Sequence, residues 1–148
     1  MAGDSQVTVG GDTRVFVSDP KCWRVEMPTG GALVVGAAGD ATCDEVLCGV
    51  TWSAGPLTWR ARIAARAKEF DCTDLMVLIG WRGTLWTYDD TALYTLEGKV
   101  GAIGTGADYA LGFMHASHEP PHCRVRKAVL GSSGRNTYVG GKVRVIST

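Results

Sequence analysis

The chain has 148 residues, of which 45% are apolar and 20% are charged. This length and apolar share favour a single domain over residues 1–148 with a core of its own. Fifteen basic residues balance fifteen acidic ones, which argues against nucleic acid and membrane surfaces as partners because both attract a basic excess. No apolar run approaches the roughly 18 residues of a membrane span, and the N-terminal residues lack the order of a signal peptide. We therefore expect a soluble, cytoplasmic protein.

The chain has five cysteines, an odd number, and no recognisable export signal. Such a set predicts reduced thiols rather than a disulfide framework. Cys43 and Cys48 lie five residues apart on a predicted helix, a spacing that does not place them on one face.

Strands are predicted first along the chain. Alternating and β-branched residues at 13–18 indicate a strand, and residues 21–27 are the expected hairpin partner. The continuous apolar run at 32–38 is typical of a strand covered on both faces.

Two helices are predicted next. Thr42 and Glu45 have the spacing of a capping box, which starts a helix by satisfying its free amide groups, and Gly55 with Pro56 is expected to end it. From 57 to 70, apolar residues including Trp59 and Ile63 recur at helical spacing, which indicates an amphipathic helix.

The second half of the chain returns to strands. Residues 75–79 and 84–88 predict a hairpin around a turn at 80–83, and residues 94–96 and 100–103 are expected to extend the sheet.

The last elements are two more helices and a strand. They are predicted at 107–116, from Pro120-Pro121 to about Gly131, and at 138–146, with the prolines suiting a first helical turn. Helices in pairs between antiparallel strands indicate a layered α+β fold.

Histidines and a cysteine in HASHEPPHC form the obvious metal candidate. Imidazole and thiolate groups of His115, His118, His122 and Cys123 suit zinc, but Pro120 and Pro121 interrupt the helix between them. An exposed loop between two helices is the preferred interpretation, so no metal is predicted.

Glycine-rich steps are the candidates for a phosphate cradle. Gly10-Gly11, Gly30-Gly31 and Gly104-Thr105-Gly106 have neither the Walker spacing nor the dinucleotide fingerprint. They are interpreted as turns, and no cofactor is predicted.

Of the five tryptophans, Trp59 is expected in the core and Trp81 is expected to be the most exposed. Trp81 lies at a hairpin turn beside Arg82, and an exposed aromatic residue next to an arginine is a reasonable ligand contact. Both residues are therefore candidates for binding.

Five segments, in order along nearly the whole chain, resemble proteasome β-subunits and bacterial HslV, which are N-terminal-nucleophile hydrolases. They are residues 2–8 (AGDSQVT), Lys21 in DPKCWRV, residues 36–41 (GAAGDA), residues 100–111 (VGAIGTGADYAL) and residues 138–141 (YVGG). The resemblance implies a four-layer αββα sandwich of antiparallel sheets, truncated at the N-terminus. It also implies that Asp4, Lys21 and Thr105 are the supporting residues of the family's catalytic site.

The nucleophile of that family is an N-terminal threonine, whose own α-amino group acts as the base. It is expected about fourteen positions upstream of residues 2–4, where this sequence begins with Met1, and neither Thr8 nor Thr13 takes its place. The late acidic residue of the family site falls near Asn136. The resemblance therefore implies the scaffold of a peptidase without its attacking group.

Two hypotheses follow. The first is a non-catalytic, self-assembling subunit, viral or accessory, that binds or sequesters a small anionic ligand or a peptide. Its pocket would lie around Asp4, Lys21 and Thr105, with Gly104 as a further ligand contact. It would act in the host cytoplasm if virus-encoded. The second is a threonine-type peptidase whose start lies upstream of Met1. A homo-oligomer, in a ring or a stacked assembly, is expected under both, because the family assembles and exposed sheet edges need cover.

Overall fold

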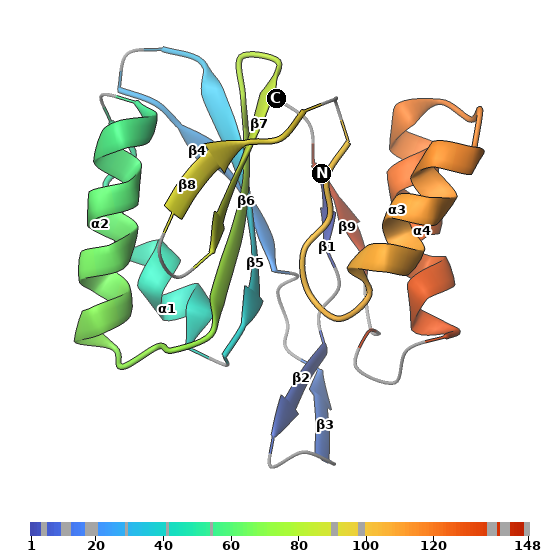
Figure 1. Ribbon diagram of the computed structural model, residues 1–148, viewed down its shortest axis with the longest axis horizontal. Coiled ribbons are helices and arrows are strands. Elements are labelled where there is room, and N and C mark those ends of the chain that lie inside the picture. Colours follow the sequence, from blue (N-terminus) through green and yellow to red (C-terminus); the bar gives the residue numbers. More distant parts are fainter. Residues whose placement is uncertain are drawn as a thin grey trace.

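The computed structural model describes residues 1–3, 6–9, 13–16, 21–28, 30–40, 42–53, 55–89, 92–97, 100–135, 139 and 143–146. Its elements stack in layers (Figure 1): helices α1 and α2, a five-stranded sheet, the short strands β1 and β9, and helices α3 and α4. The predicted α+β fold of helices packed on antiparallel sheets is confirmed. Among the residues described here, no helix is long and apolar enough to cross a membrane.

The five-stranded sheet is antiparallel throughout and has the order β4-β5-β6-β7-β8. Its strands are Cys22–Glu26, Ala32–Gly39, Leu75–Trp81, Thr84–Asp89 and Ala92–Thr95. Strand β5 is buried on both faces over residues 33–37, as its apolar run predicts. The β6–β7 hairpin also follows the prediction, with Arg82 and Gly83 at the turn, both at positive φ.

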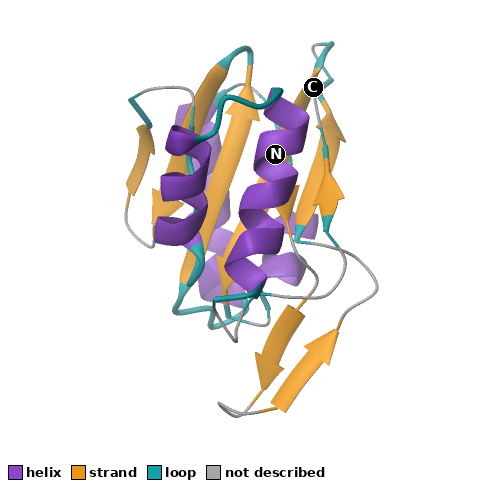
Figure 2. Ribbon diagram, turned by 90° about the vertical axis from the view of Figure 1, so that its right-hand side faces the viewer, coloured by secondary structure: helices purple, strands orange, loops and turns teal. Residues whose placement is uncertain are grey.

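One predicted strand pairing is wrong. The predicted strand at 21–27 corresponds to β4 (Cys22–Glu26), which pairs with β5 rather than with the strand predicted at 13–18. Strand β3 (Thr13–Phe16) instead pairs with β2 (Gln6–Val9), in a hairpin that projects beyond the layers (Figures 1 and 2). Both observed pairings also join strands that are neighbours along the chain, so residue patterns alone did not decide which neighbour each strand pairs with.

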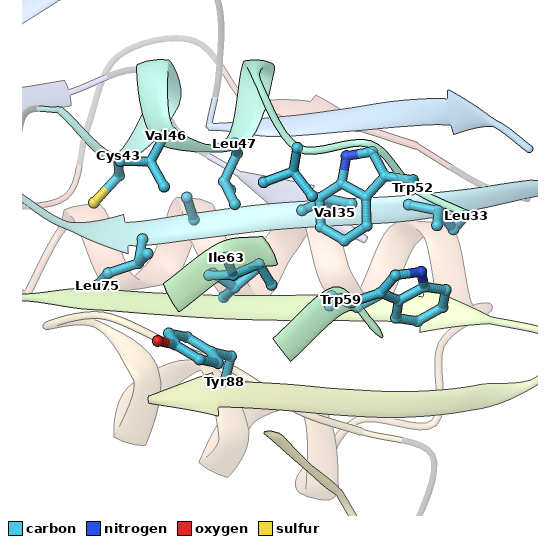
Figure 3. Packing of buried hydrophobic residues seen from close by; sticks show 14 of the residues in the cluster. Leu33, Val35, Cys43, Val46, Leu47, Trp52, Trp59, Ile63, Leu75 and Tyr88 are labelled. Carbon is cyan, nitrogen blue, oxygen red and sulfur yellow. The ribbon is translucent and has the colours of Figure 1, made fainter. Parts of the chain in front are cut away.

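Helices α1 (Cys43–Cys48) and α2 (Pro56–Glu69) cover one face of the five-stranded sheet and form the larger core with it. Trp59 and Ile63 are fully buried and lie on one side of α2, as the predicted apolar stripe requires. Figure 3 shows both side chains in the cluster with Leu33, Val35 and Trp52. Four tryptophans meet there, and Trp59 packs edge-on against the other three: Trp52, Trp81 and Trp86.

Helix α1 is shorter than predicted. It begins after Thr42 as expected, but it ends at Cys48, well before Gly55. Thr42 makes no side-chain cap hydrogen bond, so the capping box is not formed. Gly55 is instead the N-cap residue of α2, with a positive φ, and Pro56 occupies the first turn.

The other face of the sheet looks toward α3 (Ala107–Ala116) and α4 (Pro121–Ser133), both close to their predicted positions. Strands β1 (Ala2–Gly3) and β9 (Arg144–Val145) lie between, paired antiparallel and in contact with α4. Residues 100–103 are not a strand, contrary to the prediction. They belong to the connection before α3, in which Val100 and Ala102 pack against the small α3–α4 core.

Candidate functional site

A cavity of about 990 Å³ separates the five-stranded sheet from α3 and α4. The layer between two packed sheets is normally about 10 Å thick and is filled by interdigitating side chains. Here, among the described strands, only β1 and β9 occupy the layer between the sheet and these helices, and each has two residues. The cavity is the part of the layer that these short strands do not fill.

The sheet presents small and apolar side chains to this cavity. Alternate residues of a strand face opposite sides, so Val34 and Ala38 of β5 and Met76 and Leu78 of β6 line the cavity. Their neighbours, such as Val35 and Val77, belong to the core under α1 and α2. Helices α3 and α4 add apolar side chains from the opposite wall, among them Ala110, Met114, Val125 and Ala128. The walls therefore suit an apolar ligand surface.

Lys21, Gly104 and Thr105, predicted as site residues from distant parts of the sequence, all line this one cavity. Lys21 directly precedes β4, and its carbonyl oxygen accepts a hydrogen bond from the Ala37 amide at 3.1 Å. Its backbone is thereby fixed at the end of the sheet.

The Gly104–Gly106 turn crosses from the sheet to the helices. Gly104 has φ +84°, and a Cβ there would lie 3.0 Å from Cβ of Ala38. At its other end the Gly106 carbonyl accepts a hydrogen bond from the Ser132 hydroxyl of α4 at 3.3 Å. The turn that carries Thr105 therefore contacts β5 at one end and α4 at the other, and Thr105 lines the cavity between them.

Carboxylates border the same cavity, and the sequence analysis did not select them. Asp40, Asp44 and Asp74 line it together with the cations Lys21 and Arg124. One Asp40 carboxylate oxygen accepts hydrogen bonds from the amides of Thr73 and Asp74 at 3.0 and 3.2 Å. The sequence signal that could have pointed to Asp40 is its position directly after Gly39, at the end of an apolar strand.

Of the two candidates at the β6–β7 turn, Trp81 lines the same cavity, whereas Arg82 does not. Trp81 is half-buried rather than exposed, because its ring packs edge-on against Trp59 with 5.3 Å between centroids. This places the ring with the core under α2, although Trp81 also borders the cavity. The Arg82 guanidinium stacks over the Trp81 ring at 4.6 Å and lies outside the cavity.

The histidine-rich segment runs from the last turn of α3 to the first turn of α4. His115, His118 and His122 are exposed, and His122 Nε2 lies 3.2 Å from the Cys123 sulfur. Within the described part of the chain, no three His, Cys, Asp or Glu side chains are arranged as metal ligands. Asp4 and Asn136, which the resemblance also selected, lie outside the described residues.

No protein-family model and no curated protein matches the chain, but solved structures match its fold closely. BPH from Thiobacillus denitrificans aligns with a TM-score of 0.69 and 22% identity over 97% of this chain and 88% of that one. HslV from Trypanosoma brucei gives 0.67 and 18% over the same shares. Anbu from Hyphomicrobium sp. strain MC1 gives 0.69 and 15% over 96% and 73%.

The chain has the HslV-like fold of proteasome β-subunits. The resemblance read from the sequence is confirmed at the level of the fold, including the layered arrangement of two helix pairs around antiparallel strands. In this HslV-like fold, Lys21 and Thr105 line one cavity.

Proposed function

We propose that this HslV-like chain is a non-catalytic, self-assembling subunit that binds a peptide or another small ligand with an anionic group in the cavity beside Lys21. The observation that carries the proposal is the convergence of Lys21, Gly104 and Thr105 on one large cavity with apolar walls. An ammonium group at the border of an apolar cavity attracts a carboxylate or phosphate, because ion pairing is stronger where water is excluded. Asn136, at the position where the resemblance expects an acid, supports a role other than hydrolysis.

The mixed charge of the border favours a peptide over a simple anion. Three aspartates and two cations, Lys21 and Arg124, line the cavity, so their formal charges do not favour anions overall. A peptide carries a carboxylate, an amino group and an apolar middle, and it matches such a border better than inorganic phosphate does. We therefore expect its carboxylate to pair near Lys21 and its apolar side chains to contact the sheet.

Self-assembly is supported by the fold and by the surface. Anbu from Pseudomonas aeruginosa, which shares the fold at a TM-score of 0.64, forms a helical assembly. In this chain Tyr109 of α3 is 42% exposed and Leu130 of α4 is 39% exposed, and Gly131, next to Leu130, is close to the Tyr109 ring. An apolar pair on the outer face of the α3–α4 layer suits contact with a second copy.

Calorimetric titration with two peptides tests the binding proposal. One is a short apolar peptide with a free C-terminal carboxylate, and the other is the same peptide amidated. The wild type should bind the carboxylate form about tenfold more tightly, the value of one charge-assisted hydrogen bond. Lys21→Met should remove this preference, whereas Lys68→Met, on the exposed side of α2, should keep it. Equal affinities of the wild type for both peptides would contradict the role of Lys21.

A threonine-type peptidase is the second candidate, if translation begins upstream and supplies an N-terminal threonine. It is favoured by BPH from Thiobacillus denitrificans, whose structure was solved in complex with epoxomicin. Incubation with epoxomicin followed by intact mass measurement separates the two candidates. A covalent adduct on a mature chain that starts with threonine would support the peptidase, whereas an unmodified chain that still binds the carboxylate peptide supports the non-catalytic subunit.

A further inference from the structure

Two buried cysteine thiols from separate parts of the chain meet at one corner of the fold. Cys43 is the first residue of α1, and Cys72 follows α2, just before β6. Their sulfur atoms lie 4.0 Å apart, and both residues are buried, with 3% and 8% of their surfaces exposed. The five cysteines all lie among the described residues, and none of them is in a disulfide in this structure.

Both thiols also lie near backbone carbonyl groups. The Cys43 thiol is also within 3.7 Å of the carbonyl oxygens of Ala38 and Asp74, and the Cys72 thiol is within 4.0 Å of the Asp74 oxygen. A disulfide needs a sulfur–sulfur distance of about 2.05 Å, so side-chain rotation must bring the sulfurs together by roughly the difference. Cys43 also lines the large cavity, which gives a small molecule a route to the pair.

We propose that Cys43 and Cys72 form a redox-sensitive dithiol site, which hydrogen peroxide entering through the cavity converts into a disulfide. One thiol, as its thiolate, attacks a peroxide oxygen and becomes a sulfenic acid with release of one water. The second sulfur then displaces the hydroxyl group, forming the S–S bond and a second water. In sum, two thiols and one peroxide give one disulfide and two waters; the sulfurs are oxidised and the peroxide oxygens are reduced.

The environment makes this reaction slow. Burial raises the pKa of the Cys43 thiol, and the adjacent Cys72 thiol raises it further, with smaller contributions from Asp40 and Asp44. Little thiolate is therefore present at neutral pH, and the thiolate is the reactive form. The pair responds to sustained peroxide exposure rather than acting as a fast peroxidase.

The disulfide would close a loop from α1 to the start of β6, next to the Gly39–Asp40 border of the cavity. The two cysteines are 29 residues apart in the sequence, and a disulfide that closes such a loop restricts the unfolded chain. For a domain of this size, the melting temperature should therefore rise by about 10 °C. Oxidation would thereby fix one wall of the cavity.

Peptide mapping of the peroxide-treated protein under non-reducing conditions tests the proposal. The wild type should yield a peptide pair linked through Cys43 and Cys72, and dithiothreitol should reverse both the link and the rise in melting temperature. Cys48→Ala is the matched control, because Cys48 is exposed on the same helix, and it should form the link as the wild type does. Cys43→Ala and Cys72→Ala should not form it or show the rise.

The wild-type map decides the question even if a single variant fails to fold. The proposal is wrong if Cys43 and Cys72 are both recovered as free thiols after Cys48 has been fully oxidised. It is equally wrong if either residue is recovered as a sulfinic acid or linked to another cysteine.

Discussion

Gly39 packs against the backbone of Asp74 so closely that a Cβ on Gly39 would lie 1.8 Å from the Asp74 carbonyl oxygen. The same contact is continued by a hydrogen bond of 2.8 Å from the Asp40 amide to that oxygen. Gly39 has φ +124°, a conformation that other residues rarely adopt. The corner between β5 and β6, at the border of the cavity, therefore requires glycine for two separate reasons.

Replacing Gly39 tests this corner. Gly39→Ala should lower the free energy of unfolding by about 3 kcal/mol or more, because the methyl group collides with backbone and the φ angle is strained. Gly112→Ala is the matched control: a Cβ at that helical position meets nothing within 4 Å, so it should stabilise by about 0.5–1 kcal/mol. Urea unfolding measures both changes. Similar effects of the two substitutions would contradict the close approach of Gly39 to Asp74.

Trp59 is expected to contribute more to stability than most residues. It is fully buried, and its ring contacts three other tryptophans. Trp59→Ala should cost about 3–5 kcal/mol, measured by denaturant unfolding. Trp59→Phe should cost less, because it keeps an aromatic ring and removes the indole N–H, which is buried without a hydrogen-bond partner. A loss below about 1 kcal/mol for Trp59→Ala would contradict this account of the core.

The raised pKa of Cys43 gives the stability a pH dependence. In the folded protein the pKa of Cys43 lies above the ordinary thiol value of 9.0. The folded thiol therefore keeps its proton at pH values at which the unfolded chain releases it. Above pH 9 the folded state therefore binds more protons than the unfolded state, and stability falls as the pH rises. Thermal melting of the wild type and Cys43→Ala from pH 7 to 10 measures this effect. The melting temperature of the wild type should fall more steeply above pH 9, and parallel curves would contradict the assignment.

The outer face of α3 and α4 is the expected contact between copies. Leu130→Glu should lower the mass of the assembly measured by light scattering, because a charge at an apolar contact must be desolvated without a partner. Leu57→Glu introduces the same charge at a side chain of α2 that is 90% exposed and should leave the mass unchanged. If Leu57→Glu dissociates the assembly and Leu130→Glu does not, the contact lies on the α1–α2 layer instead.

Patterns that depend on local spacing predicted much of the fold. The repeat that includes Trp59 and Ile63 predicted α2, and the apolar run at 32–38 predicted a strand buried on both faces. Local spacing did not decide which neighbouring strand β4 pairs with or where the helix after Thr42 ends. Strand β4, within the predicted residues 21–27, pairs with β5, and α1 ends at Cys48, while Gly55 starts α2 rather than ending α1.

The candidate site was also predicted only in part. Lys21 and Thr105 were selected through ordered motifs along the whole chain, and the fold brings them to one cavity. Trp81 was selected from its turn alone, and Trp59 from another element covers its ring. The meeting of Cys43 with Cys72 has no local signature, because residues far apart in the sequence create it. Among the aspartates at the cavity border, only Asp40 has one, in the Gly39-Asp40 step that ends an apolar strand.

The central claim is that this HslV-like chain assembles and holds a ligand in its cavity. Native mass spectrometry of the purified protein, followed by measurement of its denatured mass, tests the claim most directly. We predict a multimer of intact 15.7 kDa chains that releases a small molecule or a peptide on denaturation. A bare monomer with nothing bound would contradict both parts of the claim.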